Sequence, residues 1–376
     1  MKFKKYYLNE LVEIKYGKNQ KKVIDENGKY PIYGTGGLMG YAKEFLYDRP
    51  SVLIGRKGTI NKVRYVERPF WTVDTLFYTK IKDDVVIPKF LYYKMLTIDL
   101  TKYNEGTTIP SLRTETLNKL ELEIPNIEIQ QKIVSILNVL DSKIALNKKI
   151  NNNLEQQAQA IFKSWFIDFE PFDGNMLDNW HDGIVADLAQ EIICGKTPST
   201  KKAEYYGGDT PFITIPDMHG CVYNVKTERY LSQRGVKSQP KKTLPPNSVC
   251  VSCIGTAGLI TLVSEKSQTN QQINSIIPKE GISPYYIYLL MQTKSEIINK
   301  LGQSGSTIVN LNKTQFGKIK IIIPSLNIMQ KFNDICSPLF EKILLNQKEN
   351  IRLAVLRDGL LPKLMSGELD ISNIDI

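Results

Sequence analysis

Two segments of the chain carry apolar residues at alternating spacings of three and four, the pattern of long helices in a coiled coil. The stripe positions are Ile133, Leu137, Leu140, Ile144, Asn147, Asn151, Leu154, Ala158, Ile161 and Trp165 in the first segment, and Phe332, Cys336, Leu339, Ile343, Asn346, Asn350, Leu353, Arg357, Leu360 and Leu364 in the second. A proline, Pro125 or Pro324, precedes each segment, as is common at the start of a helix. We therefore predict long helices at 127–167 and 326–366.

Asparagines interrupt both stripes at matching places. If the helices pair antiparallel so that the numbers of facing positions add up to 497, Asn147 faces Asn350 and Asn151 faces Asn346. Such a buried polar layer costs stability but fixes the register, because a slide of one heptad would bury amides against leucine. The alternative interpretation is that all four asparagines face solvent.

The same register makes further predictions along the two helices. It places Ile133 opposite Leu364 at one end and Trp165 opposite Phe332 at the other. Arg357 is the exception to the apolar pattern, and we expect its long side chain to reach past the stripe to water.

The chain also contains an internal repeat. Residues 106–144 align with residues 305–343 at a constant offset of 199. Upstream, a looser match pairs Ile54–Ile60 with Ile254–Ile260 at an offset of 200. Each copy places short β-like runs and turn residues before a strand, a proline and a long helix. Two copies of one unit explain the length of 376 residues, which is too long for a single ordinary core.

This organisation predicts an α+β fold. Two domains of mixed α/β structure are joined by two long helices that form an antiparallel coiled coil, and a pseudo-twofold relation connects the two copies. The predicted segments are 1–126 for the first domain, 127–167 for the first helix, 168–325 for the second domain, 326–366 for the second helix and 367–376 for a C-terminal tail.

Composition narrows the classes of partner. The chain has 49 Lys and Arg residues against 39 Asp and Glu, a net charge of +10, which favours nucleic acid ahead of an acidic membrane surface. No stretch approaches the ~18 apolar residues of a membrane span, and the N-terminal segment lacks an apolar signal core. Five cysteines, an odd number, indicate a reduced, cytoplasmic protein.

Residue types that carry catalysis are scarce. Two histidines are too few for a zinc site built on histidine pairs, and Cys250 and Cys253 lack the second ligand pair of a structural zinc site. The sequence has no GxxxxGK[ST] phosphate loop, no G-x-S-x-G elbow and no (D/N)PP(F/Y) segment of an adenine methyltransferase. We therefore predict no catalytic residue and no metal site in this chain.

Several motifs carry a resemblance to one known family. They are GTTIPSL at 106–112, QQKI at 130–133, AIFKSWF at 160–166 and LRDGLLPKLMSGE at 356–368. Together with the repeat of domain and helix, these motifs resemble the specificity subunit of type I restriction-modification systems. The segment YPIYGTGGLMGY at 30–41 is also similar to a loop common in the domains of that family.

The resemblance implies a non-catalytic subunit that reads double-stranded DNA. Each domain would recognise one part of a split, asymmetric target, and the coiled coil would determine the gap between the parts. The resemblance further implies assembly with two modification subunits, which methylate adenine N6, and with restriction subunits. S-adenosylmethionine, ATP and Mg²⁺ would bind to those partners, and no cofactor would bind to this chain.

Two other functions remain open at this point. One is a self-contained adenine-N6 DNA methyltransferase, which the missing catalytic segment disfavours. The other is a coiled-coil scaffold protein without a role on DNA, which leaves the basic charge unexplained.

Candidate DNA contacts lie in turns beside the β-like runs. Arg56 and Lys57 occupy a turn flanked by glycines, where arginine suits guanine and lysine suits phosphate. The amides of Gln271, Gln272 and Asn274 suit adenine edges. The further candidates are Tyr33, Gly36, Gly37, Thr107, Thr108, Ser111 and Arg113 in the first copy, and Lys196, Lys201, Lys202, Thr307 and Lys313 in the second. Each is also compatible with an ordinary turn or surface role, and the repeated segment around Thr107 favours backbone contact over base reading.

Overall fold

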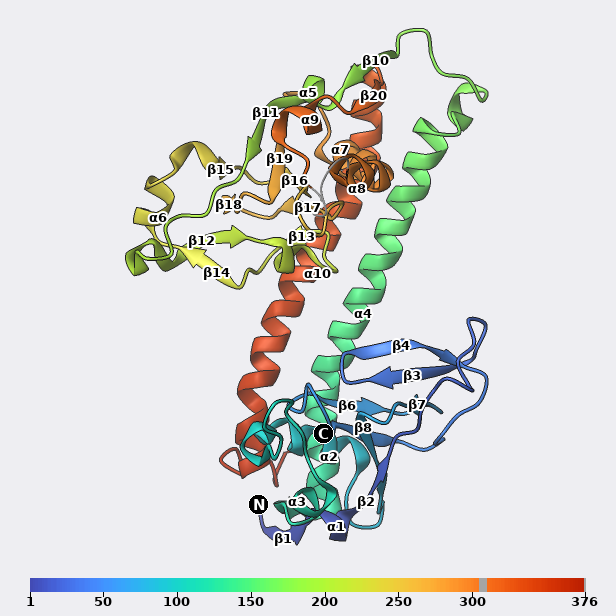
Figure 1. The fold of residues 1–376 in the computed structure, drawn as a ribbon, viewed down its shortest axis with the longest axis vertical. Helices are drawn as coiled ribbons and strands as arrows, with labels where there is room; N and C mark the ends of the chain where they lie inside the picture. Colours follow the sequence, from blue (N-terminus) through green and yellow to red (C-terminus); the bar gives the residue numbers. More distant parts are fainter. Residues whose placement is uncertain (304–309, 375–376) are drawn as a thin grey trace. The chain divides into compact units, whose positions relative to one another are not determined.

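The computed structural model describes residues 1–303 and 310–374. It divides into two compact units, each of which contains sheets and a part of both long helices (Figure 1). Unit 1 comprises Met1–Ser142 and Leu353–Ile376, and unit 2 comprises Lys143–Arg352. The predicted α+β class is confirmed in both units.

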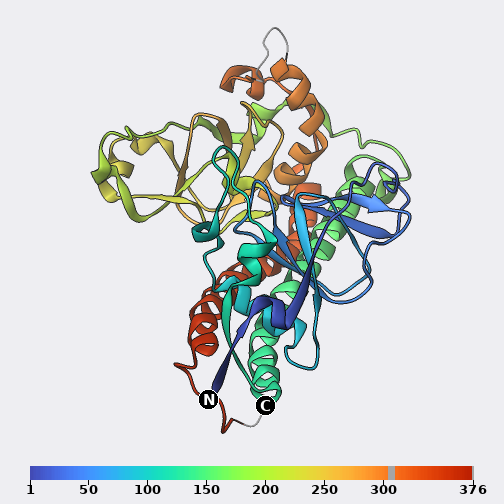
Figure 2. The same ribbon diagram turned by 60° about the horizontal axis from the view of Figure 1, so that its bottom comes forward.

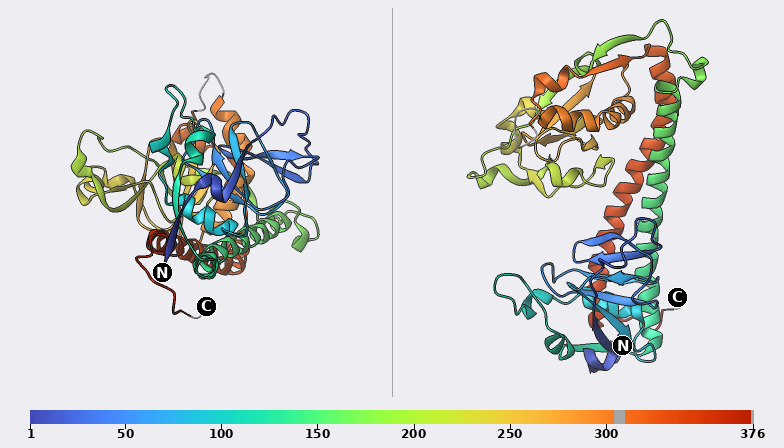
Figure 3. Two further views of the ribbon diagram at one scale, coloured as in Figure 1. Left: turned by 90° about the horizontal axis from the view of Figure 1, so that it is seen from below. Right: turned by 45° about the vertical axis from the view of Figure 1, so that its right-hand side comes forward.

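The two long helices are α4 (Ile127–Phe166) and α10 (Leu326–Ser366). They confirm the two predicted helical segments. The Asn126 side chain accepts a hydrogen bond from the amide of Ile129 (3.0 Å) and so caps the start of α4. Figure 3 shows the helix segments of each unit side by side.

The antiparallel register agrees with the predicted sum of 497. In unit 2, Asn147 Nδ2 donates to Asn350 Oδ1 (3.0 Å) and Asn346 Nδ2 donates to Asn151 Oδ1 (2.8 Å). In unit 1, Ile133 and Leu364 are fully buried in one hydrophobic cluster. The predicted partner of Trp165, Phe332, lies 6.1 Å from it between ring centroids.

Unit 1 contains three small sheets. A two-stranded antiparallel sheet pairs β1 (Phe3–Tyr7) with β9 (Glu121–Pro125). The second sheet has the order β2 (Val12–Tyr16), β8 (Leu76–Ile81), β5 (Ser51–Gly55), β6 (Val63–Val66), and the third has the order β4 (Gly37–Ala42), β3 (Tyr30–Gly34), β7 (Trp71–Thr72). The helices are α1 (Leu8–Leu11), α2 (Pro88–Leu96) and α3 (Thr114–Asn118), which Figure 2 shows from another direction.

Unit 2 repeats this arrangement with additions. Strand β10 (His181–Ile184) pairs with β20 (Lys320–Ile323). The second sheet has the order β11 (Ala189–Cys194), β19 (Ile273–Pro278), β16 (Val249–Ser252), β17 (Ile260–Val263), β13 (Tyr223–Asn224), and the third has the order β14 (Arg229–Leu231), β12 (Tyr206–Ile213), β18 (Ser267–Thr269), β15 (Thr243–Leu244). The helices are α5 (Val185–Leu188), α6 (Gln233–Lys237), α7 (Pro284–Thr293), α8 (Ser295–Gln303) and α9 (Lys313–Gly317).

Equivalent backbone hydrogen bonds establish which residues of the two units correspond. The amide of Leu112 donates to Arg56 O, and the amide of Leu311 donates to Cys253 O, both at 2.9 Å. The strand registers agree, because Ile54 pairs with Phe77 in unit 1 as Val251 pairs with Asn274 in unit 2. The offset for this part of the repeat is therefore 197, and the offset of 200 predicted from sequence is wrong by three residues.

The hydrophobic core of each unit includes a second face of the long helices. Phe162 and Phe340 are buried in the main cluster of unit 2, although neither is on the predicted stripe. The stripe residues Leu140, Ile144 and Leu154 are only partly buried. The reason is that each helix packs against a domain as well as against the other helix, so its apolar surface is wider than a coiled-coil seam.

Candidate nucleic-acid interface

In unit 1, the turn after β5 lies against the loop that precedes α3. The amide of Arg56 donates to the carbonyl of Thr75 (2.8 Å), and the carbonyl of Arg56 accepts from Leu112. Lys57 and Ser111 form an isolated antiparallel bridge. The structure thus brings the candidates Arg56, Lys57 and Ser111 together, at the end of the sheet where β5 stops and β8 starts.

The side chains of the two basic residues in this turn differ in how firmly they are held. Arg56 Nη1 donates to the carbonyl of Asp74 (2.9 Å), and its guanidinium lies 5.0 Å from the centre of the Tyr16 ring. Arg56 is therefore held in one orientation by a hydrogen bond and a cation–π contact. Lys57 is exposed, and its side chain forms no hydrogen bond or ion pair with the described part of the chain.

The loop before α3 is built on the side chain of Asn104. Its Oδ1 accepts hydrogen bonds from the amides of Gly106 (2.9 Å) and Ser111 (2.8 Å). Thr107 and Thr108, at the tip of the loop, are exposed. Arg113 forms an ion pair with Glu105 (Nε to Oε2, 3.0 Å), so its charge is already partly balanced.

The predicted glycine loop is the turn of the hairpin between β3 and β4. Gly36 has open space around the position of a Cβ, and Gly37 has φ of 133°, which favours glycine. Tyr33 is half-buried and packs edge-on against Phe70 (6.5 Å between centroids). Tyr33 therefore contributes to the core, whereas Gly36 forms an open tip.

In unit 2, the amide-rich segment lies at the corresponding end of the sheet. Gln271 is exposed, and its Oε1 accepts a hydrogen bond from Thr197 Oγ1 (2.7 Å). Gln272 is half-buried and accepts from Asn270 Nδ2 (2.9 Å). Asn274 is only 2 % exposed and donates to the carbonyl of Leu311 (3.1 Å), so the structure does not fit the base contact predicted for it.

The remaining predicted contacts of unit 2 are spread over its surface. Lys196 and Lys201 are exposed, and Lys202 Nζ donates to the hydroxyl of Tyr205 (3.1 Å). Lys313 is the exposed first residue of α9, away from Lys196 along the chain and in the fold. Thr307 lies outside the described residues.

Two groups of basic residues were missed by the sequence analysis. Lys18 follows β2 as Lys196 follows β11, and only the structural register reveals that they correspond. On α6 and just after it, Arg234, Lys237 and Lys241 are exposed near the segment of Lys196. The link is made by Gln239, whose Nε2 donates to the carbonyl of Lys196 (2.7 Å). A count of basic residues between 234 and 242 would have indicated this group.

The positive charge is distributed unevenly. Residues 1–126 contain 22 Lys and Arg against 15 Asp and Glu, whereas residues 168–325 contain 16 against 14. Between 168 and 195 there are seven acidic residues and no Lys or Arg. The positive field of the second domain therefore depends on the segments that begin at Lys196.

The four asparagines form the predicted polar layer within unit 2. Asn147 is fully buried and Asn346 is 1 % exposed. Asn147 also donates to Glu349 Oε2 (2.7 Å), which lies 3.6 Å from Lys143 Nζ. The buried Oδ1 of Asn147 has no hydrogen-bond partner in the described structure, so this layer carries an energetic cost.

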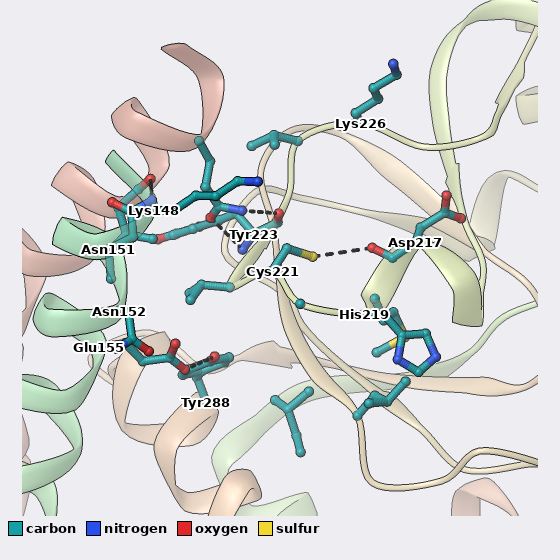
Figure 4. Close-up of a pocket in the computed structure, with 18 of the residues that line it drawn as sticks. Lys148, Asn151, Asn152, Glu155, Asp217, His219, Cys221, Tyr223, Lys226 and Tyr288 are labelled. Atoms are coloured by element: carbon teal, nitrogen blue, oxygen red, sulfur yellow. Dashed lines mark hydrogen bonds between the residues drawn. The ribbon is translucent and has the colours of Figure 1, made fainter. Parts of the chain in front are cut away.

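A pocket of about 910 Å³ lies in unit 2 between the long helices and the loop around His219 (Figure 4). Some of its polar groups form hydrogen bonds with one another. Glu155 Oε1 accepts from the Tyr288 hydroxyl (2.7 Å) and from Gln292 Nε2 (2.9 Å). Cys221 Sγ donates to the carbonyl of Asp217 (3.3 Å), and burial raises the pKa of this thiol to about 12. A thiol with that pKa is not a nucleophile at neutral pH.

Within 1–303 and 310–374, the chain contains neither a metal-binding cluster nor a helix that could span a membrane. No group of three or more His, Cys, Asp or Glu residues in those ranges is arranged to hold a metal ion. No helix described there is both long enough and apolar enough to cross a bilayer.

Known proteins similar to this chain agree on one family. The model of the type I restriction modification DNA specificity domain matches residues 1–156 and 178–354. The type I restriction enzyme HindI specificity subunit of Haemophilus influenzae is 37 % identical over 360 residues, which cover 76 % of this chain and 78 % of that protein. The MjaIX specificity subunit of Methanocaldococcus jannaschii is 28 % identical over 350 residues, 88 % of this chain and 80 % of that protein.

One solved structure has a comparable fold over nearly the whole chain. It is the S subunit of a type I restriction-modification system from M. genitalium, with a TM-score of 0.62 at 19 % identity, covering 97 % of this chain and 96 % of that one. At this identity the likeness supports the fold alone, and the family follows from the sequence matches. This chain belongs to the type I restriction modification DNA specificity family.

Proposed function

We propose that this chain is the DNA-reading subunit of a type I restriction-modification complex and that it recognises a target in two parts, one with each unit. The observation that carries the proposal is the repeat itself. The two units share one backbone design, and they present different side chains at the same end of equivalent sheets. Two such readers in one chain are suited to a split target whose parts differ in sequence.

The long helices are the basis for a fixed gap between the two parts. Helix α4 is continuous over 40 residues, and its pairing with α10 is held in register by the asparagine layer. DNA half-sites read by related modules are separated by about one helical turn, ~34 Å, or a multiple of it. A rigid spacer would therefore select one separation, and its length would be part of the specificity.

The partners in this proposal are double-stranded DNA, two modification subunits and restriction subunits. The family match, which names a DNA specificity domain of type I restriction modification, supports these partners. S-adenosylmethionine, ATP and Mg²⁺ would be bound by the partner subunits. The small positive charge of the second domain also supports a complex in which partner subunits supply part of the contact with phosphate.

The test is to map N6-methyladenine in the genome of the host with and without the gene. Loss of one bipartite motif is the expected result, and return of that motif with the plasmid-borne gene is the control. An unchanged methylome in a host whose modification subunits are active would overturn the proposal. Methylation by this chain alone, with S-adenosylmethionine and DNA, would instead show a self-contained methyltransferase.

A further inference from the structure

We infer that Lys18 and Lys196 are equivalent phosphate contacts, one in each unit, and that the positions beside them determine which bases each unit prefers. The inference rests on the proposed function. The variable positions are Lys57, Asp74 and Thr75 in unit 1, which correspond to Ile254, Gln271 and Gln272 in unit 2. We call each lysine with its three neighbours the strand-end surface of that unit.

The backbone around the two lysines is held in the same way. In unit 1, the amide of Gly17 donates to Leu76 O (3.0 Å) and the amide of Lys18 donates to Thr72 O (2.9 Å). In unit 2, the amide of Gly195 donates to Ile273 O (3.0 Å) and that of Lys196 to Thr269 O (2.9 Å). These pairs of hydrogen bonds place the two lysines at equivalent points of the two equivalent sheets.

Side chains of different types fix the carbonyls of the two lysines. Trp71 Nε1 donates to the carbonyl of Lys18 (2.9 Å), and Gln239 Nε2 donates to that of Lys196 (2.7 Å). With both the amide and the carbonyl occupied, each lysine has a fixed backbone. The same local geometry reached with different residues indicates that the position of the lysine is what matters.

The preceding glycines are required by close packing. A Cβ added to Gly17 would lie 2.0 Å from the carbonyl oxygen of Val73, and one added to Gly195 would lie 2.1 Å from that of Asn270. Val73 and Asn270 occupy equivalent positions, because their amides bond to Tyr33 O and Ile213 O respectively. In both units this segment therefore packs closely against the backbone of the sheet, and the lysine side chain that follows is exposed.

The neighbouring positions differ in chemistry. The amides of Arg56 and Cys253 donate to the carbonyls of Thr75 and Gln272, which establishes those two as equivalents. Lys57 corresponds to Ile254, because each pairs with the loop before the next short helix. Asp74, exposed in unit 1, corresponds to Gln271, exposed in unit 2.

This combination of one constant lysine and variable neighbours fits the division of labour at a protein–DNA interface. The phosphate backbone is the same for every target, so a contact to it can be kept in two units that read different bases. Base edges differ, so their readers must differ. A carboxylate accepts from the amino group of cytosine, lysine donates to guanine, and a glutamine amide pairs with adenine.

The experiment uses the complete complex with its modification subunits and a duplex that carries its methylated motif. Lys18→Ala and Lys196→Ala are each compared with the wild type across a range of salt concentrations. We expect affinity about tenfold lower at 0.1 M salt and a salt slope smaller by about 1, because one phosphate contact contributes about 0.9 to that slope. The consensus motif should not change, and Lys18→Arg should restore most of the affinity.

Two further lysines provide matched controls. Lys119 and Lys318 directly follow α3 and α9 and are both exposed. These helices pack near α1 and α5, which precede β2 and β11, so the control residues lie at the opposite end of the strands from Lys18 and Lys196. Lys119→Ala and Lys318→Ala should leave affinity and salt slope unchanged.

A second pair of variants tests the neighbouring positions. Asp74→Gln and Gln271→Asp exchange the residues between the two units, and each should alter the base preference in one part of the motif only. An altered motif after Lys18→Ala, or an unaltered salt slope after both lysine substitutions, would overturn the inference while a bipartite wild-type motif leaves the proposed function standing. If the wild-type complex methylates no bipartite motif, the proposed function itself fails.

Discussion

Next to the two strand-end surfaces, the two units share a backbone and differ in side chains. In unit 1, Arg56 lies against the ring of Tyr16, whereas the equivalent positions of unit 2 are Cys253 and Cys194. Burial raises the pKa of Cys253 to about 12, so unit 2 has a neutral thiol where unit 1 places a guanidinium. The fold therefore specifies where side chains are placed and leaves their chemistry open, as a reader of DNA sequence requires.

The helix pair differs between the units as well. In unit 1, Arg357 Nη1 donates a hydrogen bond to Asp141 Oδ1 (2.8 Å), and the Tyr93 hydroxyl donates one to Asp141 Oδ2 (2.6 Å). Burial lowers the pKa of Arg357, but its hydrogen bonds to Asp141 and Asp358 outweigh burial and leave the pKa raised. In unit 2, aromatic rings pack at another point of the helix pair, with Phe332, the equivalent of Ile133, in contact with Phe162, Trp165 and Phe166. Unit 1 thus adds a charge network to the apolar packing of its helices, whereas unit 2 adds aromatic rings.

The largest effect should come from the aromatic contact. Phe332→Ala removes a fully buried ring and should lower the free energy of unfolding by about 4 kcal/mol. Arg357→Ala, which breaks a half-exposed charge network in unit 1, should cost only about 1 to 2 kcal/mol. Denaturant unfolding measures both, and hydrogen exchange assigns the loss to a unit. Equal costs for the two substitutions would refute the contrast between packing and charge.

A smaller effect should be equal in the two units. Gly17→Ala and Gly195→Ala both force a Cβ onto a backbone carbonyl, and each should cost about 2 kcal/mol. Gly36→Ala is the matched control, because no atom lies within 4 Å of its added Cβ, and it should be nearly neutral. The measurement is the thermal unfolding midpoint of each variant. If only one of the two glycines is sensitive, the strand ends are not equivalent.

The smallest effect concerns the asparagine layer, which only unit 2 contains. Asn147→Leu removes an amide with an unsatisfied buried oxygen, so we expect stability to change by no more than about 1 kcal/mol. The register should become less defined, and spin labels on exposed positions of α4 and α10 should report a broader distance distribution. A distribution as narrow as that of the wild type would show that the asparagines do not specify register.

The periodic parts of the chain were predictable from sequence. A stripe with spacings of three and four defines a helix over many turns, and matched asparagines in two stripes define the register, so the pairing of Asn147 with Asn350 was correctly predicted. Arg357 was predicted to reach water and instead reaches Asp141 on the other helix, because Asp141 is beside the stripe position Leu140 and not on the stripe itself. The sequence pattern cannot reveal such lateral partners.

The equivalence of the two surfaces was not predictable in the same way. Short strands joined by turns carry no long period, so the offset had to be judged from glycine and isoleucine matches and came out three residues too high at Ile54. Asn274 was proposed as a base contact on the basis of its amide-rich neighbours, but its side chain is buried in β19. Lys18 was overlooked because only hydrogen bonds to Thr72 and Thr269 show that it matches Lys196.

The length difference between the two units is concentrated in one segment. The offset between equivalent residues is 180 at Tyr33 and Ile213, and 197 at Ile54 and Val251, so unit 2 has 17 more residues between Ile213 and Val251 than unit 1 has between Tyr33 and Ile54. Elsewhere the offset shifts by only one to three residues. Duplicated genes accumulate insertions where the fold accepts them, and here that place holds α6 and its basic residues. This segment can therefore lengthen, and add basic side chains, without disturbing the lysine that both units place at the end of the strand.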